Sequence, residues 1–202
     1  MTSHDSHDTS SLTPPSRGLA IALVHRPVLD KEGLVVTTAL TNIDVHDLAR
    51  SGRTYGCTDY FIVHPIEVQR ELATRIVQHW TEGSSAKRIP DRKDALSIVR
   101  TVATLEDAVT ALGSASDVEV WVTAARVLPG KAALSFAAAR ERLESASGGP
   151  VLLVFGTGWG LAPEVIERAH AVIEPIRGAG AWNHLSVRSA CSIALDRLRS
   201  PR

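Results

Sequence analysis

The sequence predicts an α/β domain built on a parallel sheet that helices cover on both faces. From Leu19 onward, short apolar runs rich in β-branched residues alternate with amphipathic segments. This alternation is typical of parallel strands joined by crossover helices. The chain has 202 residues, of which 44% are hydrophobic, which is enough for one compact domain with a sizeable core. We therefore expect a single domain over residues 18–202.

Hydrophobic periodicity predicts six strands and six helices along this domain. The predicted strands are Leu19–Val24, Asp59–Val63, Ser97–Val102, Glu119–Thr123, Val151–Phe155 and Ala171–Glu174. The predicted helices are Val45–Tyr55, Ile66–Thr81, Leu105–Leu112, Ser135–Ser145, Pro163–Ala169 and His184–Leu198. The polar stretch Glu82–Asp94, which holds four basic residues, is predicted to be a surface loop.

Residues 1–17 are predicted to form a disordered tail before the domain. They are rich in Ser, Thr, Asp, His and Pro. Such a segment buries too little apolar surface to offset the entropy that ordering costs.

The composition excludes several classes of protein. Lys plus Arg and Asp plus Glu number 22 each, so any surface for a polyanion must be a local patch. Cys57 and Cys191 lie far apart without a CxxC pair, which argues against zinc and disulfides and predicts two buried thiols. No apolar run reaches the ~20 residues of a membrane span. We expect a cytoplasmic protein without metal.

A glycine-rich loop follows the fifth predicted strand. Val151–Phe155 runs directly into Gly156-Thr157-Gly158-Trp159-Gly160, and a helix begins at Pro163. Loops at the carboxyl ends of parallel strands are where such folds bind ligands, and glycine lets a ligand approach the backbone. The loop is either a small-molecule site or a tight structural turn.

A dinucleotide site is disfavoured at this loop. The dinucleotide fingerprint follows the first strand of such folds, whereas the first strand here runs into His25-Arg26-Pro27 without a glycine. Glu164, beside the helix start at Pro163, would also repel a phosphate. His25 and His64 both end strands, and we expect satisfied surface histidines there rather than acid–base groups.

The most informative stretch lies before the last helix. It contains a Pro175–Gly178 loop followed by Asn183-His184-Leu185-Ser186-Val187-Arg188-Ser189-Ala190. This stretch resembles the final motif of the SPOUT methyltransferases. Leu152–Leu161 resembles the middle motif of that class, and Thr41–Gly56, in which Arg50 precedes Gly56 by six residues, resembles the first.

The resemblance covers nearly the whole predicted domain and implies both fold and function. It implies a Rossmann-like parallel sheet whose C-terminal part forms a trefoil knot, a topology that periodicity alone would not predict. It implies an S-adenosylmethionine (SAM)-dependent enzyme that methylates a tRNA or rRNA nucleotide as a homodimer. Within the class, the chain is similar to single-domain bacterial proteins with the Asn183–Ala190 signature.

Two points stay open at the level of the sequence. The ribose-methylating branch of the class usually has Glu where this chain has Gly158, so the acceptor is either a base or a ribose hydroxyl. A binding protein of the same fold, which holds RNA or SAM without turnover, is the alternative function.

The resemblance also implies site residues. Arg50 and Arg53 are the candidates for handling the acceptor, because guanidinium groups grip phosphate and oxyanions; a helix-surface role is the alternative for Arg50. The candidate SAM-binding residues are Thr123, Phe155, Gly156, Thr157, Gly158, Ile176, Gly178, Trp182, Asn183, Leu185, Ser186 and Val187. Among them, Ile176 and Leu185 could be core residues and Ser186 a helix cap. The Trp182 ring could stack on a base or pack against the knot.

Overall fold

The computed structural model of the chain describes residues 17–82, 87–145, 147–180 and 182–201. A parallel sheet of seven strands runs through this part of the chain, in the order β5-β4-β1-β8-β6-β9-β7. The strands are β1 (Leu19–Val24), β4 (Tyr60–Val63), β5 (Val99–Val102), β6 (Glu119–Val122), β7 (Ala133–Leu134), β8 (Val151–Gly156) and β9 (Ala171–Ile173). The predicted parallel α/β fold is confirmed.

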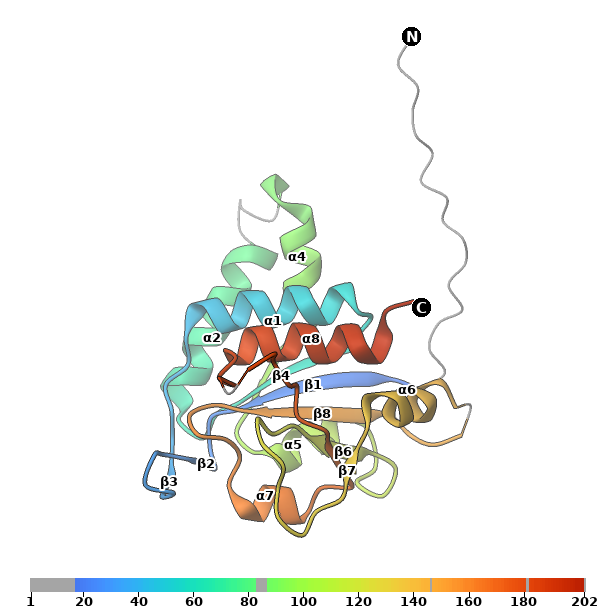
Figure 1. The fold of residues 1–202 in the computed structure, drawn as a ribbon. Helices are drawn as coiled ribbons and strands as arrows, with labels where there is room; N and C mark the ends of the chain where they lie inside the picture. Colours follow the sequence, from blue (N-terminus) through green and yellow to red (C-terminus); the bar gives the residue numbers. More distant parts are fainter. Residues whose placement is uncertain (1–16, 83–86, 146, 181, 202) are drawn as a thin grey trace.

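Helices cover both faces of the sheet (Figure 1). One face carries α1 (Asn42–Thr54), α2 (Glu67–Thr81), α4 (Pro90–Leu96), α6 (Phe136–Glu144) and α8 (Val187–Arg199). The other carries α5 (Leu105–Leu112) and α7 (Pro163–Glu167). This division gives the molecule three layers, with one hydrophobic core on each side of the sheet.

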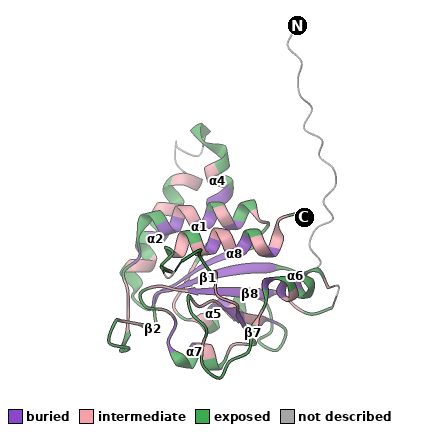
Figure 2. Cartoon of the chain, viewed as in Figure 1, coloured by how far each residue is buried: buried purple, intermediate pink, exposed green. Residues whose placement is uncertain are grey.

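The central strands are buried on both faces, as Figure 2 shows for β1 and β8. Leu19, Ile21 and Leu23 point toward α1 and α8, whereas Ala20 and Ala22 point toward α5. This alternation follows from the period of two along a strand. Each fully buried Leu or Ile contributes about 1.5–3 kcal/mol, so the larger side chains concentrate the stabilisation on the α1 and α8 face.

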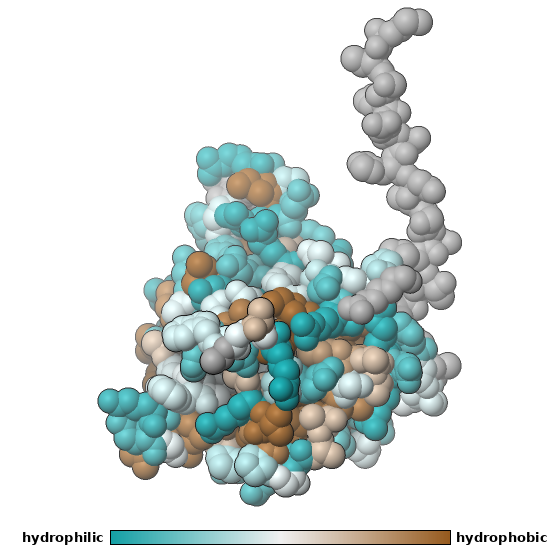
Figure 3. Space-filling view, in the orientation of Figure 1, coloured by the Kyte–Doolittle hydropathy of each residue, from teal (hydrophilic) through white to brown (hydrophobic). Residues whose placement is uncertain are grey.

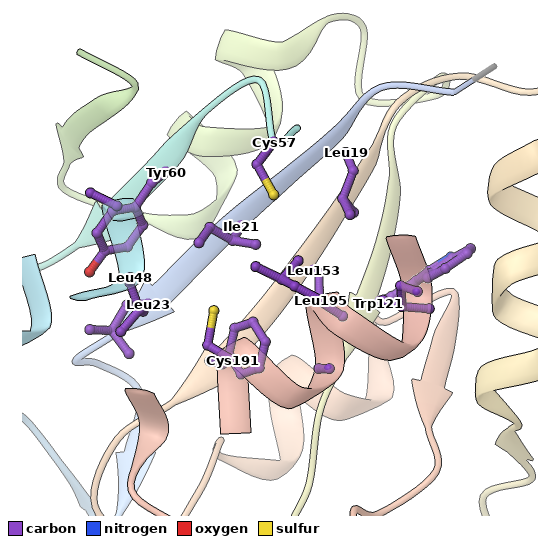
Figure 4. Packing of buried hydrophobic residues seen from close by; sticks show 14 of the residues in the cluster. Leu19, Ile21, Leu23, Leu48, Cys57, Tyr60, Trp121, Leu153, Cys191 and Leu195 are labelled. Atoms are coloured by element: carbon purple, nitrogen blue, oxygen red, sulfur yellow. The ribbon is translucent and has the colours of Figure 1, made fainter. Parts of the chain in front are cut away.

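Both cysteines lie in this core, as predicted. Figure 4 shows Cys57 and Cys191 among the leucines between the sheet and α8. Burial raises the pKa of the Cys57 thiol to about 12, so it stays protonated and inert.

The chain passes through an arch that it has already formed. β9 lies between β6 and β7, and Val122 of β6 and Ala133 of β7 both pair with Val172 of β9. Residues 123–132 therefore arch over the carboxyl end of β9. The chain enters β9 from α7 on one face and leaves it for α8 on the opposite face (Figure 1). This threading is the trefoil knot that the sequence analysis predicts.

The structure adds four short elements that the periodicity did not predict. The predicted loop Glu82–Asp94 is wrong in its second half, because α4 begins at Pro90 and buries Ala95 and Leu96. β2 (Val28–Leu29), β3 (Val35–Val36) and β7 have two residues each. Two residues are too few for a hydrophobic period to show, and α4 has the charged composition of a surface loop in its first five residues.

The boundary of the predicted tail also needs a correction. Arg17, which the sequence analysis assigns to the tail, is only 4% exposed. Its Nε donates to the Gly149 carbonyl at 2.7 Å, and its Nη2 pairs with Glu119 at 2.8 Å. The domain thus includes Arg17, while residues 1–16 lie outside the described part of the chain.

We predict that Arg17→Ala lowers the free energy of unfolding by about 2–3 kcal/mol, because it removes a buried guanidinium group and its hydrogen bonds to the half-buried Glu119 and Gly149. The matched control is Arg168→Ala: Arg168 and its partner Glu106, which lies 2.7 Å away, are both exposed. An exposed pair contributes about 1 kcal/mol at most. Urea denaturation of both variants is the measurement, and equal losses would show that Arg17 is not part of the folded domain.

Candidate functional site

A cavity of about 300 Å³ opens at the carboxyl edge of β6 and β9, beside the knot. Two segments form its walls: the start of the arch after β6 and the loop after β9. The lining residues are Ala125, Arg126, Val127, Pro175, Arg177, Gly178, Gly180 and Asn183. Gly178 and Asn183 are the two predicted cofactor residues that the structure brings together here.

One hydrogen bond joins the two walls. Asn183 Nδ2 donates to the Ala125 carbonyl at 2.7 Å. Thr123, another predicted residue, is half-buried at the base of the arch and donates its hydroxyl to the Val154 carbonyl at 3.0 Å. These bonds hold the arch and the last loop in one arrangement.

Six of the lining residues are not among the predicted cofactor-binding residues. They are Ala125, Arg126, Val127, Pro175, Arg177 and Gly180. For Ala125, Arg126 and Val127 the available signal was their position, because the loop after Thr123 also follows the carboxyl end of a parallel strand, where ligands bind. The sequence did not indicate that β9 lies beside β6.

The glycines at the cavity differ from those of the glycine-rich loop. A Cβ at Gly178 would meet its nearest atom, the Trp182 carbonyl oxygen, at 3.5 Å, and a Cβ at Gly180 would meet nothing within 4 Å. Neither glycine is required by packing within the protein. A Cβ at Gly156 would lie 2.8 Å from the Leu161 nitrogen, and one at Gly158 would lie 2.8 Å from the Leu29 carbonyl oxygen.

The loop Gly156–Gly160 is therefore packed against the rest of the chain at Gly156 and Gly158. It docks on β2: Trp159 N donates to the Leu29 carbonyl, and Leu29 N donates to the Gly160 carbonyl, both at 2.9 Å. Phe155 points into the core. Our expectation that these glycines make room for a ligand does not explain Gly156 and Gly158, whose space is taken by the chain itself.

Thr157 belongs to a buried chain of hydrogen bonds. Its hydroxyl donates to the Val24 carbonyl at 3.1 Å, so in its short contact with the Thr38 hydroxyl it is the acceptor. Because the Thr38 hydroxyl donates its proton to Thr157 rather than to the His25 carbonyl at 3.5 Å, it accepts from Nδ1 of His25 at 3.1 Å. This accounting assigns the proton of His25 to Nδ1 and leaves Nε2 as an acceptor.

His25 and His64 are buried, not surface residues as the sequence analysis expected. Their rings lie 5.1 Å apart, and His64 Nε2 donates to the Thr38 carbonyl at 3.0 Å. Burial, and next the neighbouring His64, lowers the pKa of His25 from its ordinary value of 6.5 to about 4. Both rings therefore remain neutral near pH 7.

The two predicted acceptor residues lie on α1, away from the cavity lining. Arg50 is exposed. Burial lowers the pKa of His46, and the positive charges of Arg92 and Arg50 lower it further. Arg53 forms a two-point contact with Asp94 of α4, from Nε at 2.8 Å and from Nη2 at 3.2 Å. Arg53 is thus engaged within the chain, and Arg50 is the more available of the two.

An ion pair connects α1 to the last helix. Arg188, in the first turn of α8, donates to the buried Asp44 at 2.6 Å and lies 3.8 Å from Asp47. No local pattern in the sequence indicates this pair, because Asp44 and Arg188 are far apart along the chain. It fixes the start of α8, next to the cavity loop, against α1.

The other predicted cofactor residues divide into two groups. Ile176 and Val187 pack against the core, and Ser186 caps α8 by accepting from Ser189 N at 3.2 Å. Leu185 and Trp182 are exposed. The structural roles that the sequence analysis left open for Ile176 and Ser186 are therefore realised.

Two absences hold for the described residues. In residues 17–82, 87–145, 147–180 and 182–201, no group of three or more His, Cys, Asp or Glu could hold a metal ion. Across the same ranges, no helix is both long and apolar enough to cross a bilayer.

The fold defines the class of the protein: a knotted α/β domain with a cavity between the arch and the last loop. The chain belongs to the SAM-dependent RNA methyltransferase family, whose model matches residues 18–200.

Two relatives show how far this similarity extends. The chain is 42% identical over 186 residues to a tRNA (guanine-N(1)-)-methyltransferase of Oleidesulfovibrio alaskensis, covering 91% of this chain and 42% of that protein. It is 37% identical over 182 residues to an uncharacterized protein of Aquifex aeolicus, covering 89% and 87%. The chain thus spans less than half the length of the named tRNA methyltransferase.

Solved structures share the fold at low identity. A probable methyltransferase of Bordetella pertussis has a TM-score of 0.62 at 18% identity, covering 91% of this chain and 95% of that one. The TrmH/SpoU tRNA modifying enzyme of A. aeolicus scores 0.53 at 17% identity, covering 91% and 76%. An AdoMet-bound rRNA methyltransferase of Sinorhizobium meliloti scores 0.54 at 18%, covering 90% and 55%. These similarities confirm the predicted fold class.

The buried, neutral His25 predicts a stability that depends on pH. Above pH 6.5 both the folded and the unfolded chain hold this ring neutral. Between pH 6.5 and about 4 only the unfolded chain takes up the proton, so the free energy of unfolding falls as the pH falls. The full loss from this ring is at most about 3 kcal/mol.

The measurement is urea denaturation at a series of pH values, with His25→Asn as the matched variant. The asparagine amide keeps a donor toward Thr38 but does not titrate. The free energy of unfolding of the variant should therefore fall less than that of the wild type between pH 6.5 and 4. If the free energy of unfolding fell equally with pH in the wild type and in His25→Asn, the lowered pKa of His25 would be contradicted.

Proposed function

We propose that this chain transfers a methyl group from SAM to a nucleotide of tRNA or rRNA, and that SAM occupies the cavity between residues 125–127 and 175–183. The observation that carries this proposal is the pair Gly178 and Gly180. Both line the cavity, and no internal contact requires either to lack a side chain. Glycine at such positions serves close approach of a ligand to the backbone.

The cavity residues fit SAM in kind. A volume of about 300 Å³ lies at the lower end of small-molecule sites, which run from roughly 300 to 1,000 Å³. The walls offer main-chain groups and small residues for the adenosine, and Arg126 or Arg177 can pair with the carboxylate. Bound there, SAM would supply a methyl group on a positively charged sulfur.

The chain's own residues have to orient the acceptor and manage one proton, because methyl transfer from a sulfonium needs little other help. We assign Arg50 to the acceptor RNA, where its planar guanidinium can grip a phosphate or an oxyanion. Arg53 is a weaker candidate, since Asp94 already occupies its fork. Gly158 stands where the ribose-methylating branch has Glu, so the proposal does not choose between base and ribose.

The relatives support an RNA substrate but do not name the nucleotide. The guanine-N1 activity belongs to a protein more than twice as long as the matched region. The Aquifex relative is matched over 87% of its length, so a protein of about the length of this domain exists among the relatives. We further propose that the chain works as a homodimer, which sedimentation velocity would test.

We predict that Gly178→Val abolishes SAM binding while the protein stays folded, because the added side chain fills the cavity and meets little else. Gly156→Val should instead lower the melting temperature by several degrees, because its side chain meets the Leu161 backbone. Titration calorimetry with SAM and thermal unfolding of both variants are the measurements. A folded Gly178→Val protein with unchanged SAM affinity would remove this cavity from the cofactor site.

We predict that Arg50→Ala leaves SAM affinity and stability nearly intact but slows RNA methylation by about a hundredfold, the scale of losing a positioned charged group. Arg50→Lys should restore little of this rate, because an ammonium group lacks the two-point fork. Arg75→Ala, an exposed arginine on α2, is the control. Wild-type turnover in Arg50→Ala would reduce Arg50 to a surface residue of α1.

A further inference from the structure

Trp182 is the most exposed large hydrophobic side chain of the described residues, at 77%. The indole therefore does not pack against the knot, one of the two roles that the sequence left open. The ring of His184 meets it in a T-shaped contact at 4.9 Å between centroids. Its neighbours in the chain, Gly180 and Asn183, line the cavity, whereas the indole itself does not. Trp182 thus stands at the mouth of the proposed cofactor site.

The same mouth is positively charged. Residues 123–131 and 175–186 carry Arg126, Lys131 and Arg177 and contain no Asp or Glu, in a chain whose net charge is zero. Arg126 and Arg177 are exposed and line the cavity. Figure 3 shows a mixed surface on this face of the molecule, with hydrophilic residues interspersed among apolar ones. Because the net charge of the chain is zero, the charge at the mouth is a local excess.

SAM does not account for this excess. It carries two positive groups and one carboxylate, so its net charge is +1, and one guanidinium is enough to pair with its only anion. The remaining positive charge is suited to a polyanion. Single-stranded RNA offers both phosphates for arginine and unstacked bases for an aromatic ring.

We propose that Trp182 and the one of Arg126 and Arg177 that SAM leaves free receive a single-stranded nucleotide of the substrate RNA, with its base stacked on the indole and its phosphate against the guanidinium group. This assignment rests on the proposed function and gives Trp182 to the RNA rather than to SAM. It places the stacked nucleotide beside the cofactor, which is where a methyl acceptor has to lie.

A second copy of the chain is a less suitable occupant of this surface. A two-fold interface brings the same patch of both copies together, so the arginines and lysine of one copy would approach those of its partner. Neither segment supplies a carboxylate to neutralise them. Juxtaposed like charges are costly across an interface, whereas phosphates would pair with them.

The test uses the full chain and a short, fluorescently labelled single-stranded RNA of mixed sequence, with affinity measured by anisotropy at several salt concentrations. Trp182→Ala should weaken binding by about five- to a hundredfold, the range expected for a lost stacking contact, and Trp182→Phe should retain most of the affinity. Trp159→Ala, which removes another exposed indole, should bind as the wild type does. The double variant Arg126→Gln, Arg177→Gln should lower the slope of log K against log salt by about 0.7.

SAM affinity and sedimentation of the same variants separate the outcomes. Loss of RNA affinity in Trp182→Ala with unchanged SAM affinity supports the inference. Unchanged RNA affinity overturns it, whether the variant then loses SAM affinity, dissociates as a dimer or does neither. A wild-type protein that binds no SAM would instead sink the proposed function, whatever the Trp182 variants do.

Discussion

The position of β9 between β6 and β7 is the constraint on which the rest of the site depends. Because Val172 pairs with both Val122 and Ala133, the segment that joins β6 to β7 has to arch over the end of β9. The loop that leaves β9 then emerges directly beneath this arch. The two walls of the cavity face each other for this reason, and the Asn183–Ala125 hydrogen bond closes the gap between them.

The two glycine-bearing loops of the molecule have different purposes. At Gly156 and Gly158 the missing side chains make room for Leu161 and Leu29, so the loop fastens β8 to the β2–β3 hairpin. The buried chain from His25 through Thr38 to Thr157 strengthens this attachment. At Gly178 and Gly180 the missing side chains leave open space.

Much of the fold followed from local patterns, and much of the site did not. Long buried runs such as Leu19–Val24 and Val151–Phe155 predicted their strands, because alternation and flanking turns are local properties. β7 was not predicted because two residues show no period, and α4 was not predicted because most of its residues are charged. The resemblance of Asn183–Ala190 located one wall of the cavity. The opposite wall, Ala125–Val127, depends on strand order, which no local pattern encodes.

The path of the chain, which local patterns do not encode, also explains why some predicted cofactor-binding residues have structural roles. Ile176 and Val187 have the residue types of an apolar pocket, yet the crossing to α8 places them against the core. Trp182 has the type of a core residue, yet the loop leaves it in solvent. Which of these outcomes occurs depends on the path of the threaded segment rather than on composition.

The most direct test is a crystal structure with S-adenosylhomocysteine, the demethylated product of SAM. The account requires the ligand to lie between residues 125–127 and 175–183, with its adenosine against the backbone at Gly178. Density for the ligand elsewhere, for example over Gly156–Gly160, would contradict it.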